Sequence, residues 1–248
     1  MNARSTALLG ALLLLGCSAP QPPLEVSLQE IPAGVARYQL PGALLPVEER
    51  LPGFAIMRRQ VSQAEYAACV GAGACMELEG NWREARDPQL PAVGLSWQDA
   101  SAYAAWLSQR SGARYRLPRY GEWVLAAGSA YVEEQPIVDV PGNPAQRWLA
   151  EYAREAEREP LSAQLKPFEE QAQSSTGLLG VAENVWEWTD SCFGQPAAMF
   201  PEFAYCGVRL AAGRHPSALS DFVRDPISGA CSVGVPPTHL GLRLVREN

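Results

Sequence analysis

The stretch GLLGVAENVWEWT, residues 177–189, is the most informative part of the chain, and two shorter blocks accompany it. One is YRLPRYGEW, residues 115–123, which predicts a strand that turns at Pro118 into a short helix. The other is GLRLV, residues 241–245, close to the C-terminus. The 21 glycines and 21 prolines predict many turns around these blocks, and an apolar content of 47% is ample for a core.

Together the three blocks resemble the formylglycine-generating-enzyme, or sulfatase-modifying factor, family. The resemblance spans residues 54–127 and 175–245. It implies an α+β fold of the type called C-type-lectin-like, with short helices, a few antiparallel strands and much irregular structure.

The N-terminus has the pattern of a bacterial lipoprotein signal. Arg4 precedes a short apolar run at 7–15, which is too short to span a bilayer and fits a secretory signal. The run ends in LLGC, residues 14–17, so we expect Cys17 to be lipidated. Ser18 then favours the outer membrane, with the protein facing the periplasm. The alternative is ordinary signal cleavage, with Cys17 incidental.

These observations divide the chain into three parts. Residues 1–17 are the predicted signal peptide, and the proline-rich segment 18–46 is a predicted tether followed by an edge strand. Residues 47–248 form one predicted domain, a size that suits a single core. A helical insertion is expected at about 143–173.

The charge of the chain is acidic, with a formal value of −7. No basic patch with interleaved aromatic residues occurs in the sequence, so we expect no nucleic-acid partner. For the same reason we expect the lipid, and not electrostatic attraction, to hold the protein on a membrane.

Two helices are predicted from their N-terminal capping boxes. Ser62 is followed by Glu65, and Ser96 by Asp99, each at the spacing at which both side chains cap the first turn. Gly112 then predicts the end of the second helix.

Five cysteines follow Cys17. In an oxidising compartment we expect Cys69 to pair with Cys75, and Cys192 with Cys206, spacings that resemble those of bacterial members of the family. Cys231 is then unpaired, either as a buried free thiol or as a reactive or intermolecular one. The spacing of Cys and His predicts no structural zinc.

The segment after Gly142 predicts an amphipathic helix. Asn143 can cap it and Pro144 suits its first position. Trp148 and Tyr152 lie on its apolar face, and Trp, Tyr and Arg are typical of interface hot spots. The helix either packs on its own domain or docks on a partner.

The chemistry of the family is not expected here. The resemblance implies that formylglycine formation needs two cysteines that hold copper, and soft thiolates are what copper(I) requires. The corresponding segment, 212–224, has no cysteine, and Cys231 lies beyond it. We therefore expect neither bound copper nor formylglycine-generating activity.

A different catalytic site has only weak candidates. His215, Asp221 and Arg224 lie in the segment where the catalytic turn would be. Iron would need two histidines and a carboxylate held together, and the only other histidine is His239.

Calcium is a possible cofactor. In the family the loop that matches 183–188 supplies calcium ligands, and Asn184, Val185 and Glu187 are the matching positions here. Glu183 replaces the usual glycine, which either strains a left-handed turn or adds a ligand. The alternative is that the Trp residues of this loop belong to the core and the site is empty.

The leading hypothesis is a non-catalytic, lipid-anchored binding or regulatory module in the periplasm. The chain looks most like family members of type VI secretion that act upstream of a membrane threonine kinase, so the expected partner is an envelope protein such as a kinase ectodomain. One alternative is a metal-dependent oxidase or tailoring enzyme, as in siderophore maturation. Another is a structural lipoprotein of the cell envelope.

Overall fold

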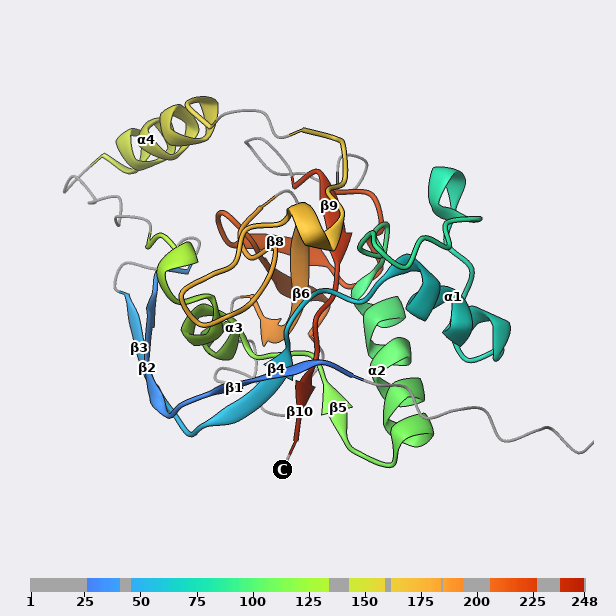
Figure 1. Ribbon diagram of the computed structural model, residues 1–248. Helices are drawn as coiled ribbons and strands as arrows, with labels where there is room; N and C mark the ends of the chain where they lie inside the picture. Colours follow the sequence, from blue (N-terminus) through green and yellow to red (C-terminus); the bar gives the residue numbers. More distant parts are fainter. Residues whose placement is uncertain are drawn as a thin grey trace, which may run out of the picture.

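The computed structural model describes residues 26–40, 46–133, 143–158, 162–183, 185–193, 206–226 and 237–247 (Figure 1). Cys17 and Cys231, and the side chain of Trp148, lie outside this description. Among the described helices, none combines the length and the apolar character that crossing a membrane requires.

The first sheet joins the two ends of the domain. Its order is β1-β4-β10-β5, and its three pairs of neighbours are antiparallel. The strands are β1 (Leu28–Ile31), β4 (Phe54–Met57), β10 (Val245–Arg246) and β5 (Tyr115–Arg116). The predicted strand before Pro118 is therefore confirmed.

A separate two-stranded ribbon pairs β2 (Gly34–Tyr38) with β3 (Val47–Leu51). Both β1 and β2 lie in the segment 18–46, which the sequence predicted to be a tether. That boundary is too late, because Ile31, Ala36 and Tyr38 are buried and contribute to the core.

The second large sheet has the order β8-β7-β6-β9. Its strands are β6 (Val185–Cys192), β7 (Val208–Ala212), β8 (Ser217–Ser220) and β9 (His239–Gly241). β6 runs antiparallel to β7 and parallel to β9, so both sides of the motif strand are paired.

Three short helices pack around the sheets: α1 (Gln63–Gly71), α2 (Trp97–Ser111) and α3 (Tyr120–Ala127). Ser62 with Glu65 and Ser96 with Asp99 form the predicted capping boxes. Gly112 follows α2 in the left-handed conformation, as predicted. The 3-10 turns are η1 (Gly80–Trp82), η2 (Gly128–Ala130) and η3 (Phe168–Glu170).

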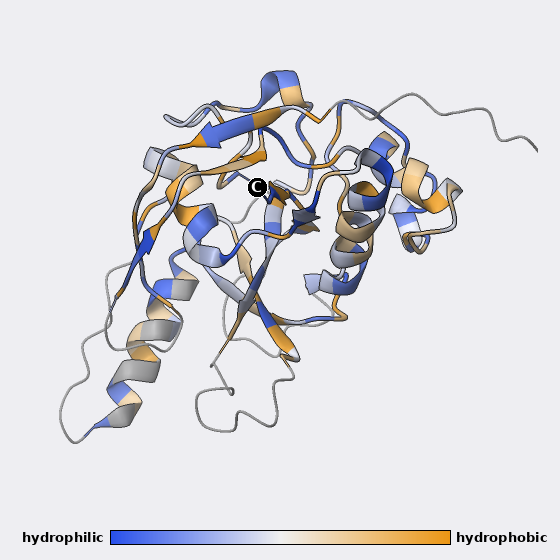
Figure 2. Ribbon diagram, turned by 90° about the horizontal axis from the view of Figure 1, so that it is seen from below, coloured by the Kyte–Doolittle hydropathy of each residue, from blue (hydrophilic) through white to orange (hydrophobic). Residues whose placement is uncertain are grey.

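The predicted insertion helix is α4 (Pro144–Ala156). In two perpendicular views it projects away from the sheets and from the other helices (Figures 1 and 2). Hydrophobic and hydrophilic residues are both visible along it in Figure 2.

The core has two main clusters. One lies with α1 and α2 and contains Trp186 and Trp188, and the other contains Trp123 of α3 together with Ile56. The structure therefore has the α+β fold that the sequence predicted.

Candidate functional site

The three sequence blocks meet at one carboxylate, that of Glu187 in β6. Its oxygens accept hydrogen bonds from Trp123 Nε1 at 2.8 Å and from Gln60 Nε2 at 2.8 Å. Arg243 donates to both oxygens, from Nε and from Nη2, each at 2.8 Å. Glu187 and Arg243 have no exposed side-chain surface. The blocks are thus joined through a buried ion pair.

Arg243 also fixes backbone segments that are distant in sequence. Its guanidinium donates to the carbonyl oxygens of Met57, Arg58 and Leu179. All five of these hydrogen bonds stay inside the fold, and the Arg243 side chain has no exposed surface, so this centre holds the scaffold together.

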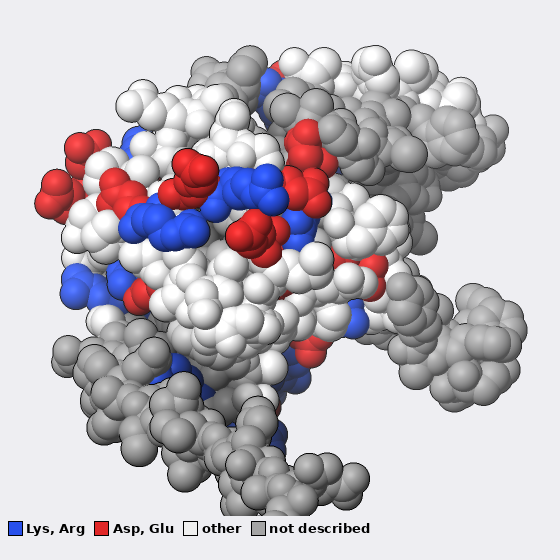
Figure 3. Space-filling view, turned by 90° about the vertical axis from the view of Figure 1, so that its right-hand side faces the viewer, with Lys and Arg blue, Asp and Glu red and all other residues white. Residues whose placement is uncertain are grey.

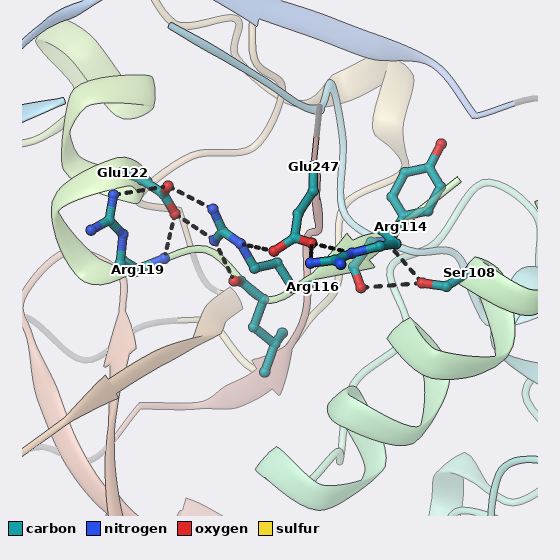
Figure 4. Close-up of polar contacts among 8 residues, drawn as sticks. Ser108, Arg114, Arg116, Arg119, Glu122 and Glu247 are labelled. Carbon is teal, nitrogen blue, oxygen red and sulfur yellow. Dashed lines mark hydrogen bonds and ion pairs between the residues drawn. The ribbon is translucent and has the colours of Figure 1, made fainter. Parts of the chain in front are cut away.

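The block around Pro118 is anchored by a second ionic network (Figure 4). Arg116 donates to both oxygens of Glu122, at 2.7 and 2.8 Å, and also contacts Glu247 at 3.1 Å. Burial alone would raise the pKa of Glu122, but the hydrogen bonds from Arg116 and from the Arg119 backbone lower it. Arg114 completes the network by pairing with Glu247.

The structure does not assemble the weak catalytic candidates into a common site. His215 is buried with its ring against Trp186, at 5.2 Å between centroids. Asp221 is buried, and its backbone bonds to Gly207 and Gln98. Arg224 instead contacts α2, where it forms a bidentate ion pair with Asp99 with two hydrogen bonds of 2.8 Å.

Arg224 has two further contacts, with the carbonyl oxygen of Glu77 and the carboxylate of Glu79. The hydrogen bonds that Arg224 donates to Asp99 raise the pKa of Arg224 and outweigh the effect of its burial. Its guanidinium therefore connects the segment after β8 to the first turn of α2.

The expected calcium positions lie at the start of β6. Asn184 is outside the described residues, Val185 is buried and pairs with His239, and the Glu187 carboxylate already accepts four hydrogen bonds. Elsewhere in the described ranges, no group of three His, Cys, Asp or Glu side chains is arranged to hold a metal ion.

The turn before β6 differs from expectation in one respect. The residue with positive φ is Ala182, at 56°, and not Glu183. Glu183 instead accepts a hydrogen bond from the Ala172 backbone and pairs with Lys166 at 3.1 Å. The backbone strain predicted for Glu183 thus falls on its neighbour.

Both predicted disulfides are present. Cys69 and Cys75 close the loop after α1, and Cys192 and Cys206 connect the end of β6 to the start of β7. One disulfide thus follows α1 and the other lies at the end of β6, and neither involves a residue of α4.

The helix α4 exposes its apolar residues. Leu149 is 68% exposed and Tyr152 is 61% exposed. Trp148 lies on the same helix, with its side chain outside the description. The side chains of Leu149 and Tyr152 are therefore not packed against the domain.

A cavity of about 700 Å³ lies beside Arg214, and no sequence pattern predicted it. We call it the Arg214 cavity. Its lining comes from the loop before α2, the segment after α4, the turn before β6 and the residue after Gly213: Asp87, Leu90, Ser162, Gln164, Leu165, Lys166, Pro167, Glu170, Glu183 and Arg214.

On the side seen in Figure 3, acidic and basic side chains alternate within one band, and uncharged atoms cover much of the remainder of the described surface. Among the described residues on this side, the basic side chains do not form an extended area of their own.

Comparison with known proteins places the chain among relatives of both kinds, active and inactive. Residues 28–248 match the family model of the sulfatase-modifying factor enzyme 1-like domain. The inactive C-alpha-formylglycine-generating enzyme 2 of Mus musculus is 32% identical over 127 residues, 47% of this chain and 39% of that protein. The formylglycine-generating enzyme of Thermomonospora curvata is 29% identical over 143 residues, 55% of this chain and 45% of the enzyme. The chain thus spans less than half the length of these relatives.

Solved structures share the fold at lower identity. PvdO from Pseudomonas aeruginosa has a TM-score of 0.60 at 19% identity, covering 89% of this chain and 94% of that one. CarF has a TM-score of 0.52 at 18% identity, covering 90% and 99%. The family match over nearly the whole described chain, together with this shared fold, shows that the protein belongs to the sulfatase-modifying factor enzyme 1-like family.

Proposed function

We propose that this protein is a non-catalytic binding or regulatory module that is lipid-anchored through Cys17 in the periplasm and contacts an envelope protein through α4. The observation that carries the proposal is the exposure of Leu149 and Tyr152 on a helix that projects from the domain. An amphipathic helix whose apolar residues face solvent is suited to docking in a groove of a partner.

The lack of catalysis is supported by the chemistry of the segment 212–224. It contains no cysteine, and Arg224, the second of its two arginines, is engaged by Asp99 and Glu79. A relative that is 32% identical is named as inactive, although others of similar identity are named as enzymes. The proposed partner is the ectodomain of a membrane threonine kinase of type VI secretion, and calcium at the turn before β6 would stiffen the scaffold without taking part in a reaction.

The test is in-cell crosslinking with the full-length, lipidated protein as bait. We expect one envelope protein to be enriched, and we expect Trp148→Ala combined with Tyr152→Ala to abolish that enrichment. The matched control is Met76→Ala with Val132→Ala, since both side chains are 71% exposed and lie outside α4. Equal capture by the α4 variant and the wild type would refute the docking role.

The anchor and the enzymatic alternative need separate measurements. Cys17→Ser should move the protein from the membrane fraction to the soluble periplasmic fraction. The metal content of the purified protein distinguishes the functions, because stoichiometric iron or copper would support the oxidase alternative, with His215 as the first residue to replace.

A further inference from the structure

The Arg214 cavity has the size of a ligand site and a preformed wall. Cavities that hold small molecules have volumes of about 300–1,000 Å³, and this one has about 700 Å³. The segment that follows α4 forms one wall of the cavity. It is held in place by His239, whose Nε2 lies 2.9 Å from the carbonyl oxygen of Ala163. The Phe168 backbone bonds to the Gln89 carbonyl at 2.9 Å, and Arg59 stacks on the Phe168 ring at 4.6 Å.

The charges in the cavity are only partly compensated. Lys166 and Glu183 neutralise each other at 3.1 Å. Arg214, Asp87 and Glu170 also line the cavity, and within the described part of the chain none of them takes part in an ion pair. Asp87 Oδ1 accepts one hydrogen bond, from the Gln89 backbone at 2.7 Å. One uncompensated cation and two uncompensated carboxylates therefore line the same space.

The remaining lining combines the polar residues Ser162 and Gln164 with apolar ones. The apolar residues are Leu90, Leu165 and Pro167, and Leu165 is buried against Val93 and Val185 of the core. A ligand that fits must therefore present an apolar body as well as ionic groups of both signs. A purely anionic ligand would meet two carboxylates, and a purely cationic one would meet Arg214.

We propose that the Arg214 cavity binds a small zwitterion with an apolar body, of the class of a short peptide with free termini. Its carboxylate pairs with Arg214, its ammonium group pairs with Asp87 and Glu170, and its body covers Leu90 and Leu165. Hydrogen bonds between ionised groups are stronger than those between neutral groups, so these contacts would hold both ends of the ligand. The proposal goes beyond the contact made by α4 and does not depend on it.

Isothermal titration calorimetry of the purified protein tests the proposal with tripeptides that have free termini and differ in the central residue. Saturable binding of at least one tripeptide is expected. C-terminal amidation and N-terminal acetylation should each weaken it about ten-fold or more, as expected when a charged hydrogen bond is lost. The absence of saturable binding by every tripeptide of the panel would overturn the proposal.

Variants of the charged cavity residues show which of them contacts each terminus of the tripeptide. Arg214→Gln should weaken the free tripeptide about ten-fold but leave the amidated one unchanged, because the carboxylate contact is then already missing. The double variant Asp87→Asn with Glu170→Gln should weaken binding of the free tripeptide about ten-fold and leave binding of the acetylated tripeptide unchanged, because the ammonium contact is then already missing. The controls are Arg50→Gln and Glu84→Gln, two exposed residues away from the cavity lining.

The tripeptide experiment is independent of the crosslinking test of α4. Trp148→Ala with Tyr152→Ala should bind the tripeptide as the wild type does. Binding that Arg214→Gln leaves unaltered would place the ligand outside this cavity, and circular dichroism of each variant excludes unfolding as the cause.

Discussion

Arg243 and Glu187 form an ion pair in which neither side chain has any exposed surface, with two contacts of 2.8 Å. They are separated by 56 residues in sequence. Removing one partner of such a pair leaves a buried charge without its counter-charge, which costs far more than the loss of an exposed pair.

Replacing Glu187 by Gln therefore tests the role of this pair in stability. We expect the free energy of unfolding to fall by about 3–5 kcal/mol, measured by denaturant titration. The control is Glu48→Gln, which breaks the pair of Arg37 and Glu48, with side chains 68% and 52% exposed. That change should cost less than about 1 kcal/mol. A similar small cost for Glu187→Gln would show that the centre does not support the fold.

The pair of Asp99 and Arg224 offers a second test. Asp99 also accepts hydrogen bonds from Ser96, so Asp99→Ala removes a helix cap as well as the ion pair. We expect Asp99→Ala to destabilise the protein more than Arg224→Ala does. In a double-mutant cycle the two changes should couple by about 0.5–3 kcal/mol. Purely additive effects would mean that Arg224 does not stabilise α2.

Because the pKa of the buried His239 is lowered, we expect the stability of the protein to depend on pH. Burial lowers its pKa below the ordinary value of 6.5, and the hydrogen bond to Ala163 offsets this only in part. The unfolded chain thus takes up the proton at a higher pH than the folded one does. The stability that comes from the neutral ring is complete above about pH 6.5 and decreases as the pH falls below it.

His239→Gln provides the comparison, because glutamine can still donate to Ala163 but does not titrate. Unfolding by urea should show that the wild type loses more stability than the variant between about pH 7.5 and pH 5.5. Parallel loss in the two proteins would assign the pH dependence to other groups.

The disulfide between Cys192 and Cys206 closes a loop with a sequence separation of 14. Replacing both cysteines by alanine should cost about 3 kcal/mol, the chain-entropy value for a loop of this size. Thermal unfolding with and without a reductant measures it. The reductant should lower the stability of the wild type more than that of the variant, because only the wild type can lose the link between Cys192 and Cys206.

Local signals in the sequence were sufficient for the helices. Ser62 and Ser96, with Glu65 and Asp99, predicted the starts of α1 and α2, because a capping box involves residues only three positions apart. The start of α4 at Pro144 followed from the same kind of reasoning. For the segment 18–46 the sequence predicted a tether with one edge strand, and not the two strands β1 and β2, since their partners, β4 and β3, lie elsewhere in the chain and prolines surround them.

The site depends on contacts that sequence patterns do not contain. Arg224 reaches Asp99 across 125 residues, so its role could not be inferred from its position in the segment where the catalytic turn was expected. The Arg214 cavity is lined by residues from Asp87 to Arg214, and a volume between loops has no periodicity that could predict it.

The meeting of three sequence blocks at the Glu187 carboxylate has a consequence for assigning activities within this family. In this chain the residues that carry the family resemblance also hold the architecture together, so its stability requires them whatever the protein does. The resemblance of these blocks therefore indicates the fold and does not indicate an activity. An activity has to be inferred from other parts of the chain, such as the segment 212–224, the Arg214 cavity and α4.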